Sequence, residues 1–226
     1  MTERILVWDL PTRVFHWSLA LSFAGAFVTG DSERWRDIHM LLGYTVLGLI
    51  AFRLVWGFVG SRYVRFAVLV RCFPYIIRYL AQLLRGHAWH PVGHNPAGVV
   101  AIALLLLLGI ASGGSGWAVY EEIGGDWLEK LHEFTSNAML AVVFVHIAGV
   151  LLASYLHGEN LIVAMITGRK RGAANQAISS SYPLIAMLLL TALIGFWIWS
   201  WPDSRDERWL REIGQGLKWG LGLRDK

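Results

Sequence analysis

The sequence predicts an all-α integral membrane protein, a bundle of membrane-spanning helices followed by a short C-terminal tail. Of its 226 residues, 55% are hydrophobic and 16% are charged, whereas a soluble domain has about 25% charged residues. A helix needs about 20 apolar residues to cross the hydrocarbon core of a bilayer. Five segments reach that length or come close to it: about 14–30, 38–59, 97–118, 132–156 and 182–201.

The first apolar segment resembles a signal peptide superficially, but we expect it to be a retained helix. Residues 1–13 carry two acidic and two basic side chains, and no A-x-A cleavage motif follows the apolar run. Pro11, just before that run, suits the first turn of a helix.

The distribution of basic residues predicts how the segments are oriented. The connection 60–96 contains five arginines and no acidic residue, and the connection after the fourth segment contains the basic run 169–171. By contrast, residues 119–131 contain four acidic side chains and one lysine. Loops rich in Lys and Arg stay in the cytoplasm. We therefore expect a multi-pass protein of the bacterial inner membrane, with a cytoplasmic N-terminus and the tail 202–226 on the outer side.

The segment 62–86 is not expected to span the membrane. Pro74 lies in its middle, and Arg71, Arg78 and Arg85 recur every seven residues among apolar side chains. Two interpretations stay open: an amphipathic helix in the cytoplasmic interface with its arginines near lipid phosphates, or an ordinary positively charged loop. Nucleic-acid binding is not expected, because the membrane already accounts for the arginines.

Four histidines in the apolar segments form the candidate functional site. His132 and His146 are fourteen residues apart in one segment, so they share nearly the same helix face and lie roughly 21 Å apart along the axis. His16 lies at the cytoplasmic start of the first segment, and His39 at the outer start of the second. Depth therefore pairs His39 with His132 on the outer side, and His16 with His146 on the inner side.

Two pairs of imidazoles at two depths are what a pair of b-type haems requires. The single cysteine, Cys72, and the lack of a C-x-x-C-H motif exclude a thiolate cluster and a covalent c-type haem. Iron with two imidazole ligands has no open coordination position, which favours electron transfer over oxygen chemistry. The competing interpretation for each single histidine is an interfacial or hydrogen-bonding side chain. The pairing of all four histidines by depth argues against that interpretation.

Other residues near these histidines have more than one interpretation. Arg53, near the cytoplasmic end of the second segment, is expected either to extend to the interface or to pair with a propionate of an inner haem. His157, eleven residues beyond His146, is an alternative inner ligand, a proton donor near a quinone, or an interfacial histidine. A metal site in the connection before the third segment is a minor alternative that would use His87, His90 and His94.

Several motifs resemble the bacterial cytochrome b561 family, which includes the b-type cytochrome subunit of membrane-bound nickel–iron hydrogenases. The resemblance covers about residues 5–172, and the motifs are VWDLPTRVFHW (7–17), IHMLLGY (38–44), FRLVWGFVGSRYVRF (52–66), GHNPAG (93–98), SGW (115–117) and the long run 131–171. It implies a four-helix bundle, residues 1–172, that holds two b haems through His16, His39, His132 and His146. Residues 173–226 depart from that pattern, since they add a fifth helix and a tail.

The leading functional hypothesis is a dihaem electron-transfer protein or oxidoreductase subunit. Electrons would pass between quinone, near the inner haem, and a periplasmic redox protein such as a c-type cytochrome, near the outer haem. One alternative is a superoxide:quinone oxidoreductase, although the mixed or acidic outer loops do not suit an anionic substrate. Further alternatives are a hydrogenase cytochrome b subunit and, with less support, a haem-free transporter, which would need broken helices.

Overall fold

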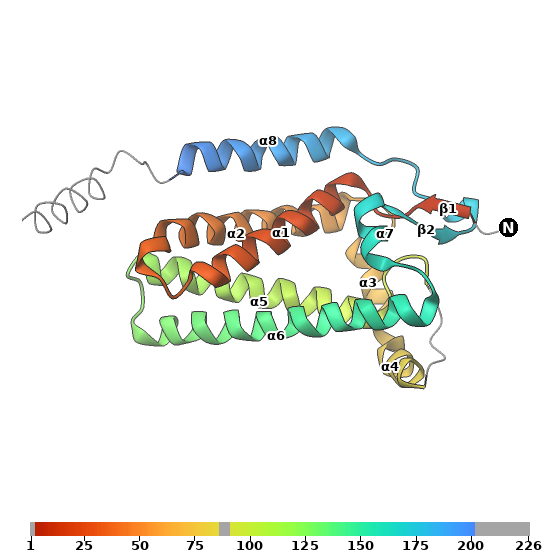
Figure 1. Cartoon of the computed structure of the whole chain (residues 1–226), viewed down its shortest axis with the longest axis horizontal. Helices are drawn as coiled ribbons and strands as arrows, with labels where there is room; N and C mark the ends of the chain where they lie inside the picture. Colours follow the sequence, from red (N-terminus) through yellow and green to blue (C-terminus); the bar gives the residue numbers. More distant parts are fainter. Residues whose placement is uncertain (1–2, 86–90, 202–226) are drawn as a thin grey trace, which may run out of the picture.

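The computed structural model describes residues 3–85 and 91–201, which form a bundle of long helices with small elements gathered at one end (Figure 1). The long helices are α1 (Leu10–Thr29), α2 (Arg36–Val59), α5 (Pro96–Tyr120), α6 (Asp126–His157) and α8 (Pro183–Ser200). The short helices are η1 (Glu33–Trp35), α3 (Phe66–Cys72), η2 (Phe73–Tyr75), α4 (Ile76–Leu84), α7 (Leu161–Thr167) and η3 (Ala174–Gln176). The strands are β1 (Glu3–Leu6) and β2 (Arg169–Gly172).

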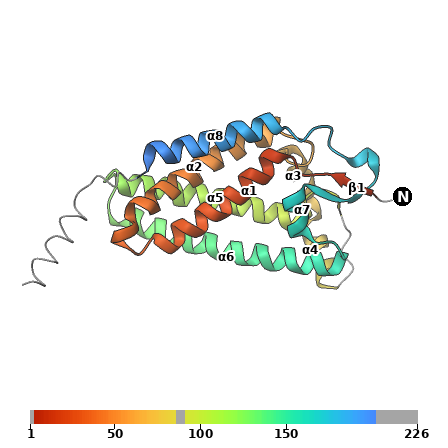
Figure 2. The same ribbon diagram turned by 45° about the horizontal axis from the view of Figure 1, so that its top comes forward.

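The bundle is built from two antiparallel helix pairs, α1 with α2 and α5 with α6, which meet where α2 packs against α5. Helix α8 lies along the outside of α1 and α2, as both views show (Figures 1 and 2). Neither α1 nor α2 packs closely against α6. The two helix pairs therefore meet mainly along α2 and α5.

The two ends of the bundle differ. One end, here called the sheet end, carries β1, β2, α3, α4 and α7 (Figure 1). The other, here called the turn end, carries the connections 30–35 and 121–125. All the basic connections that the sequence analysis assigned to one side of the membrane lie at the sheet end.

Within residues 3–85 and 91–201, four helical segments are long and apolar enough to cross a membrane: Glu33–Val59, Pro96–Tyr120, Asp126–His157 and Pro183–Ser200. They correspond to the second to fifth predicted segments. Helix α1, the first predicted segment, is 20 residues long but is not among the four, because Arg13 and His16 lower its hydropathy. Its role as a fifth span stays a prediction.

Local sequence explains where the long helices begin and end. The side chain of Asp9 accepts a hydrogen bond from Thr12 N at 2.8 Å and so caps α1. Asn95 caps α5 in the same way through Gly98 N, at 2.6 Å. Helix α6 runs for 32 residues, roughly 48 Å, and ends at Gly158, whose φ of 59° is left-handed.

The predicted all-α class is confirmed in that the chain is mostly helical, but β1 and β2 add a small antiparallel sheet that was not predicted. Its register pairs Glu3 with Gly172 and Leu6 with Arg169. Beside the sheet, the carbonyl oxygen of Gly168 accepts hydrogen bonds from Val7 N at 2.8 Å and from Trp8 N at 3.0 Å. The sheet thus ties the start of the chain to the segment that follows α7.

The segment 62–86 forms short helices rather than a span. Tyr79 of α4 and Leu69 of α3 are buried, with 1% and 6% of their surface exposed. The opposite side of the segment exposes large apolar side chains, among them Val70, Phe73 and Ile77. The exposed side thus combines these apolar side chains with Arg71 and Arg78, and the position of the segment at a membrane interface stays a prediction.

Candidate cofactor sites

At the turn end, the structure brings His39 of α2 next to His132 of α6. The centroids of the two rings are 6.0 Å apart, and the ring planes are nearly perpendicular, at 85°. His39 Nδ1 lies 2.8 Å from the carbonyl oxygen of Ala26, and His132 Nδ1 lies 2.8 Å from that of Ser112. In this arrangement each Nδ1–H donates to a carbonyl, and each Nε2 keeps a free lone pair. Histidines that bind a metal are usually oriented in this way.

Nearer the sheet end, the structure brings His16 of α1 next to His146 of α6. Their ring centroids are 6.5 Å apart. His16 Nδ1 is buried and has no hydrogen-bond partner in the protein, so the ring lacks the carbonyl contact that orients His39 and His132. The indole ring of Trp17 makes an edge contact with the His16 ring, at 5.1 Å between centroids.

Both ring separations fit two imidazoles that bind one metal ion from opposite sides. A metal–nitrogen bond is about 2 Å long and a ring centroid lies about 1 Å behind its nitrogen, so the two centroids are expected about 6 Å apart. The observed separations are 6.0 and 6.5 Å. Each pair also bridges two helices that do not pack closely on each other. The residues present therefore fit bis-histidine haem.

The turn-end pair lies in a cleft of about 340 Å³. Its lining includes Gly43, Gly113 and Gly116. A Cβ atom on Gly116 would lie 2.8 Å from Cε1 of His132, whereas a Cβ on Gly43 would meet nothing within 4 Å. Gly116 thus makes room for the histidine ring, and Gly43 borders open space. Gly149, one turn after His146, also borders open space.

Arg53 is buried near the sheet end, with 4% of its surface exposed. Its Nη2 donates to the carbonyl oxygen of Val64 at 3.0 Å, and the guanidinium lies over the ring of Phe66 at 5.0 Å from the centroid. Its Nη1 is buried and has no partner in the protein. The side chain therefore retains one donor for an acceptor at this end of the bundle.

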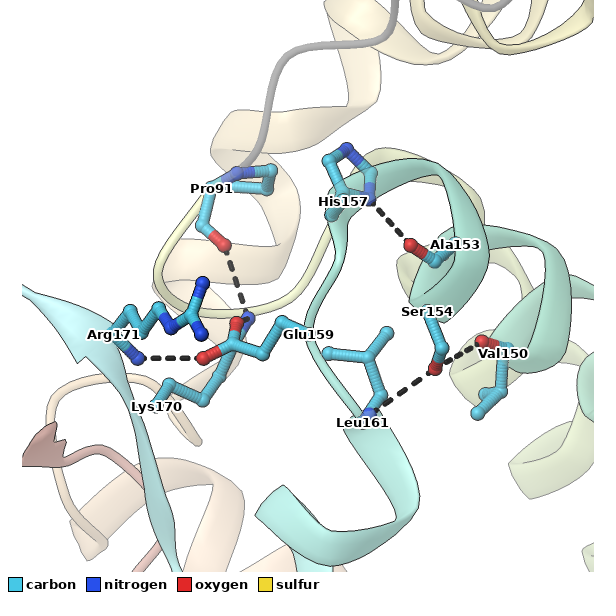
Figure 3. Close-up of polar contacts among 9 residues, drawn as sticks. All are labelled: Pro91, Val150, Ala153, Ser154, His157, Glu159, Leu161, Lys170 and Arg171. Atoms are coloured by element: carbon cyan, nitrogen blue, oxygen red, sulfur yellow. Dashed lines mark hydrogen bonds and ion pairs between the residues drawn. The ribbon is translucent and has the colours of Figure 1, made fainter.

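His157 is the last residue of α6, and its Nδ1 lies 2.7 Å from the carbonyl oxygen of Ala153 in the same helix (Figure 3). The structure places His146 beside His16, and gives no ring contact between His157 and His16. In the turn that follows, the carboxylate of Glu159 accepts from Arg171 N and lies 4.0 Å from Lys170 Nζ. Figure 3 shows these contacts joining the α6–α7 turn to β2.

The minor alternative of a metal site at three neighbouring histidines gains no support. His87 and His90 lie outside the described residues, and the described part of the chain contains no cluster of three His, Cys, Asp or Glu side chains. His94 is buried instead, with its ring 4.5 Å from that of Trp8 and its Nδ1 3.0 Å from the carbonyl oxygen of Tyr63. Burial, with the nearby Arg53 cation, lowers the pKa of His94 to about 3.

A buried polar cluster at the start of α1 is not evident from the sequence. Asp9 has no exposed surface, and both its carboxylate oxygens lie 3.3 Å from Trp56 Nε1. The ring of Tyr182 makes an edge contact with that indole, at 5.4 Å. Asp9 stands in one of the motifs quoted above, but its spacing does not reveal a partner 47 residues away.

Comparisons with known proteins identify the family of the chain. The family model described as prokaryotic cytochrome b561 matches residues 7–168. The chain is also 24% identical to a probable Ni/Fe-hydrogenase B-type cytochrome subunit of Rhodobacter capsulatus, over 74% of this chain and 81% of that protein. No solved structure matches the chain. The predicted resemblance is confirmed: the chain belongs to the prokaryotic cytochrome b561 family and is a multi-pass membrane protein of b-type cytochrome character, with haem b as its cofactor.

Proposed function

We propose that this protein is a dihaem b-type cytochrome that carries electrons across the bacterial inner membrane, between the quinone pool and a periplasmic redox partner such as a c-type cytochrome. The observation that carries the proposal is the presence of two imidazole pairs with ring separations of 6.0 and 6.5 Å. They share α6, on which His132 and His146 lie roughly 21 Å apart along the axis.

The sheet end is assigned to the cytoplasm and the turn end to the periplasm. The N-terminal strand, the arginine-rich segment 62–86 and the basic strand β2 all lie at the sheet end (Figure 1), and Lys and Arg accumulate on the cytoplasmic side of membrane proteins. Helix α1 is counted as a span because it runs beside α2. Residues 1–172 then form the four-helix cytochrome domain, and residues 173–226 form an extension that contains α8.

In this mechanism the protein binds and orients the haems, and the haems carry the electrons. Haem b, when bound, supplies one-electron redox chemistry. His39 with His132 and His16 with His146 would hold the two irons and leave no open coordination position, which disfavours oxygen chemistry. The carbonyl oxygens of Ala26 and Ser112 orient the outer pair. At the inner pair, the free Nη1 of Arg53 is the expected donor to a propionate, and His157 is a candidate to move protons at the cytoplasmic boundary.

The rim of the turn-end cleft suits a basic partner. It carries the acidic residues Asp31, Glu33 and Glu129, while Arg36 is engaged by Glu33 at 3.7 Å. A basic periplasmic cytochrome would be attracted to such a rim, and salt would weaken the attraction. The same rim disfavours superoxide, an anion, as the substrate. The Rhodobacter capsulatus relative favours a second candidate function, the cytochrome b subunit of a hydrogenase, which would use the same two sites with a different periplasmic partner.

The proposal predicts two haem b per purified chain by pyridine haemochrome. In vesicles that contain the protein, added quinol should reduce an external c-type cytochrome, more slowly at high salt. Vesicles with protein heated to remove haem serve as the control. One haem per chain, or an equal rate in the control vesicles, would contradict the proposal. Reduction of a hydrogenase-type partner but of no c-type cytochrome would select the second candidate.

The close contact at Gly116 gives a separate prediction. Gly116→Ala places a methyl group 2.8 Å from Cε1 of His132, so the ring must rotate and the turn-end haem should bind more weakly. Gly114→Ala is the matched control, since its methyl group meets nothing within 4 Å. We expect purified Gly116→Ala to have a reduced haem-to-protein ratio and Gly114→Ala to match the wild type. Equal ratios in the two variants would show that the ring does not need this space.

A further inference from the structure

Buried charge is concentrated at one end of the bundle. Among the described residues, three charged side chains are buried: Asp9, Arg53 and Lys170, with 0%, 4% and 4% of their surface exposed. All three lie at the sheet end, whereas charged residues around the turn-end cleft, such as Asp31 and Glu129, are exposed. Water and salt screen exposed charges strongly and buried charges much less. The two histidine pairs therefore lie in different electrostatic surroundings.

Arg53 lies at the level of the inner histidine pair. Helices α2 and α6 both run from the turn end to the sheet end (Figure 1), and His39 and His132 lie side by side near their first turns. Arg53 follows His39 by fourteen residues. His146 follows His132 by the same number, which corresponds to roughly 21 Å along the axis and to nearly the same helix face. Arg53 thus occupies on α2 the position that His146 occupies on α6.

The immediate contacts of Arg53 leave its positive charge uncompensated at short range. Its two contacts, the carbonyl oxygen of Val64 and the ring of Phe66, carry no net charge. The salt bridges within the described part of the chain do not include Arg53, whereas the other buried cation, Lys170, lies 4.0 Å from Glu159. A buried ion without a partner is costly, and an ionisable residue inside a membrane helix usually has a function.

The carboxylate of Asp9 is a partial counter-charge. It lies 3.3 Å from Nε1 of Trp56, three residues after Arg53 on α2, and accepts from Thr12 N at 2.8 Å. Opposite charges that are not in contact reduce each other's field without cancelling it. The imidazole of His94 adds no charge at neutral pH, since burial and then Arg53 lower its pKa to about 3. Arg53 is therefore the main source of positive field at this depth.

We propose that Arg53 raises the reduction potential of the inner haem, the one that His16 and His146 would hold, and that Asp9 limits this effect. The inference rests on the proposed function, which requires that haem, and goes beyond it by assigning control of the potential to one side chain. Reduction adds one electron to the iron, supplied by the quinol or the periplasmic partner, and no bond forms or breaks. A fixed positive charge in a medium of low dielectric constant favours the state that holds the extra electron. The influence acts through space, so it requires no contact between guanidinium and haem.

The test is a redox titration of the purified, haem-loaded protein in phosphatidylcholine nanodiscs, followed by the absorbance of the reduced haems. Each titration gives two midpoint potentials, and the one that persists in His39→Ala belongs to the inner haem. We expect Arg53→Gln to disfavour reduction of the inner haem by about tenfold, which is about 59 mV for one electron, and to leave the outer potential unchanged. Arg53→Lys keeps the charge and should retain most of the inner potential.

Two further variants separate the buried charge from other effects. Arg78→Gln is the matched control, because it removes the same charge from an exposed position of α4 at the same end of the bundle, and both potentials should match the wild type. Asp9→Asn removes the opposing charge, while asparagine still caps the start of α1. This variant should raise the inner potential, the opposite of the effect of Arg53→Gln.

The outcomes that contradict the proposal are distinguishable from a failure of the proposed function. If Arg53→Gln keeps both haems at wild-type potentials, or if Arg53→Lys falls as far as Arg53→Gln, the charge does not set the potential and the proposed function stands. Equal shifts of both potentials would indicate a general structural change and would also overturn the proposal. If Arg53→Gln loses the inner haem, Asp9→Asn decides: a raised inner potential supports the proposal, and an unchanged one overturns it. A wild type without haem at the inner pair would overturn the proposed function as well.

Discussion

His146→Ala is expected to remove one of two b haems and to leave the other in place. The structure separates the two pairs by roughly 21 Å along α6, and no ligand is shared between them. Loss of one imidazole leaves His16 without its partner at 6.5 Å, while His39 and His132 keep theirs at 6.0 Å. The haem-to-protein ratio should therefore fall from two to about one, and the remaining reduced-minus-oxidised spectrum should be that of a single bis-histidine haem.

Two companion variants make this result specific. His39→Ala should remove the other haem, so that its residual spectrum and midpoint potential differ from those of His146→Ala. His157→Ala tests the alternative inner ligand that the sequence allowed. Because its Nδ1 is engaged with Ala153 at 2.7 Å, we expect this variant to keep both haems. If His157→Ala loses the inner haem and His146→Ala keeps it, the inner ligand is His157 and not His146.

The sequence predicted the spacing of His132 and His146 because both residues lie on one helix. Fourteen residues place His132 and His146 on nearly one face at two depths, whatever packs around them. The long apolar segments likewise predict helices α2, α5, α6 and α8 to within a few residues of their ends, apart from the N-terminal end of α6. Helix α1 was harder to classify, because Arg13 and His16 reduce its hydropathy.

The sequence did not reveal the contacts between residues that are far apart in the chain. The strand pairing of Leu6 with Arg169 involves a basic four-residue segment without alternating apolar side chains, so no strand pattern marks it. The salt bridge of Lys170 with Glu159 was also invisible, since a basic run after a membrane segment normally indicates only orientation. In the fold, β2 closes the sheet end and holds one of these cations inside, with 4% of Lys170 exposed.

The second large effect is expected in the pH dependence of stability, and it arises at His94. Burial, followed by the Arg53 cation, lowers the pKa of His94 to about 3 in the folded protein, against 6.5 for the free side chain. The unfolded chain therefore binds a proton at His94 between these two values, and the folded chain does not. The free energy of unfolding should consequently fall as the pH drops below about 6.5, by up to about 1.4 kcal/mol for each pH unit.

Thermal unfolding in detergent between pH 7.5 and pH 4.5 measures this contribution, with His94→Gln as the comparison. The variant should be less stable at pH 7.5, because the ring contact with Trp8 at 4.5 Å is lost. Its Tm should then fall less steeply than that of the wild type as the pH is lowered, since glutamine does not titrate. Contributions from the rest of the chain are common to both proteins and cancel in the difference. Parallel profiles would mean that His94 accepts a proton as readily in the fold as in water, which contradicts its burial against Trp8 and the Tyr63 carbonyl.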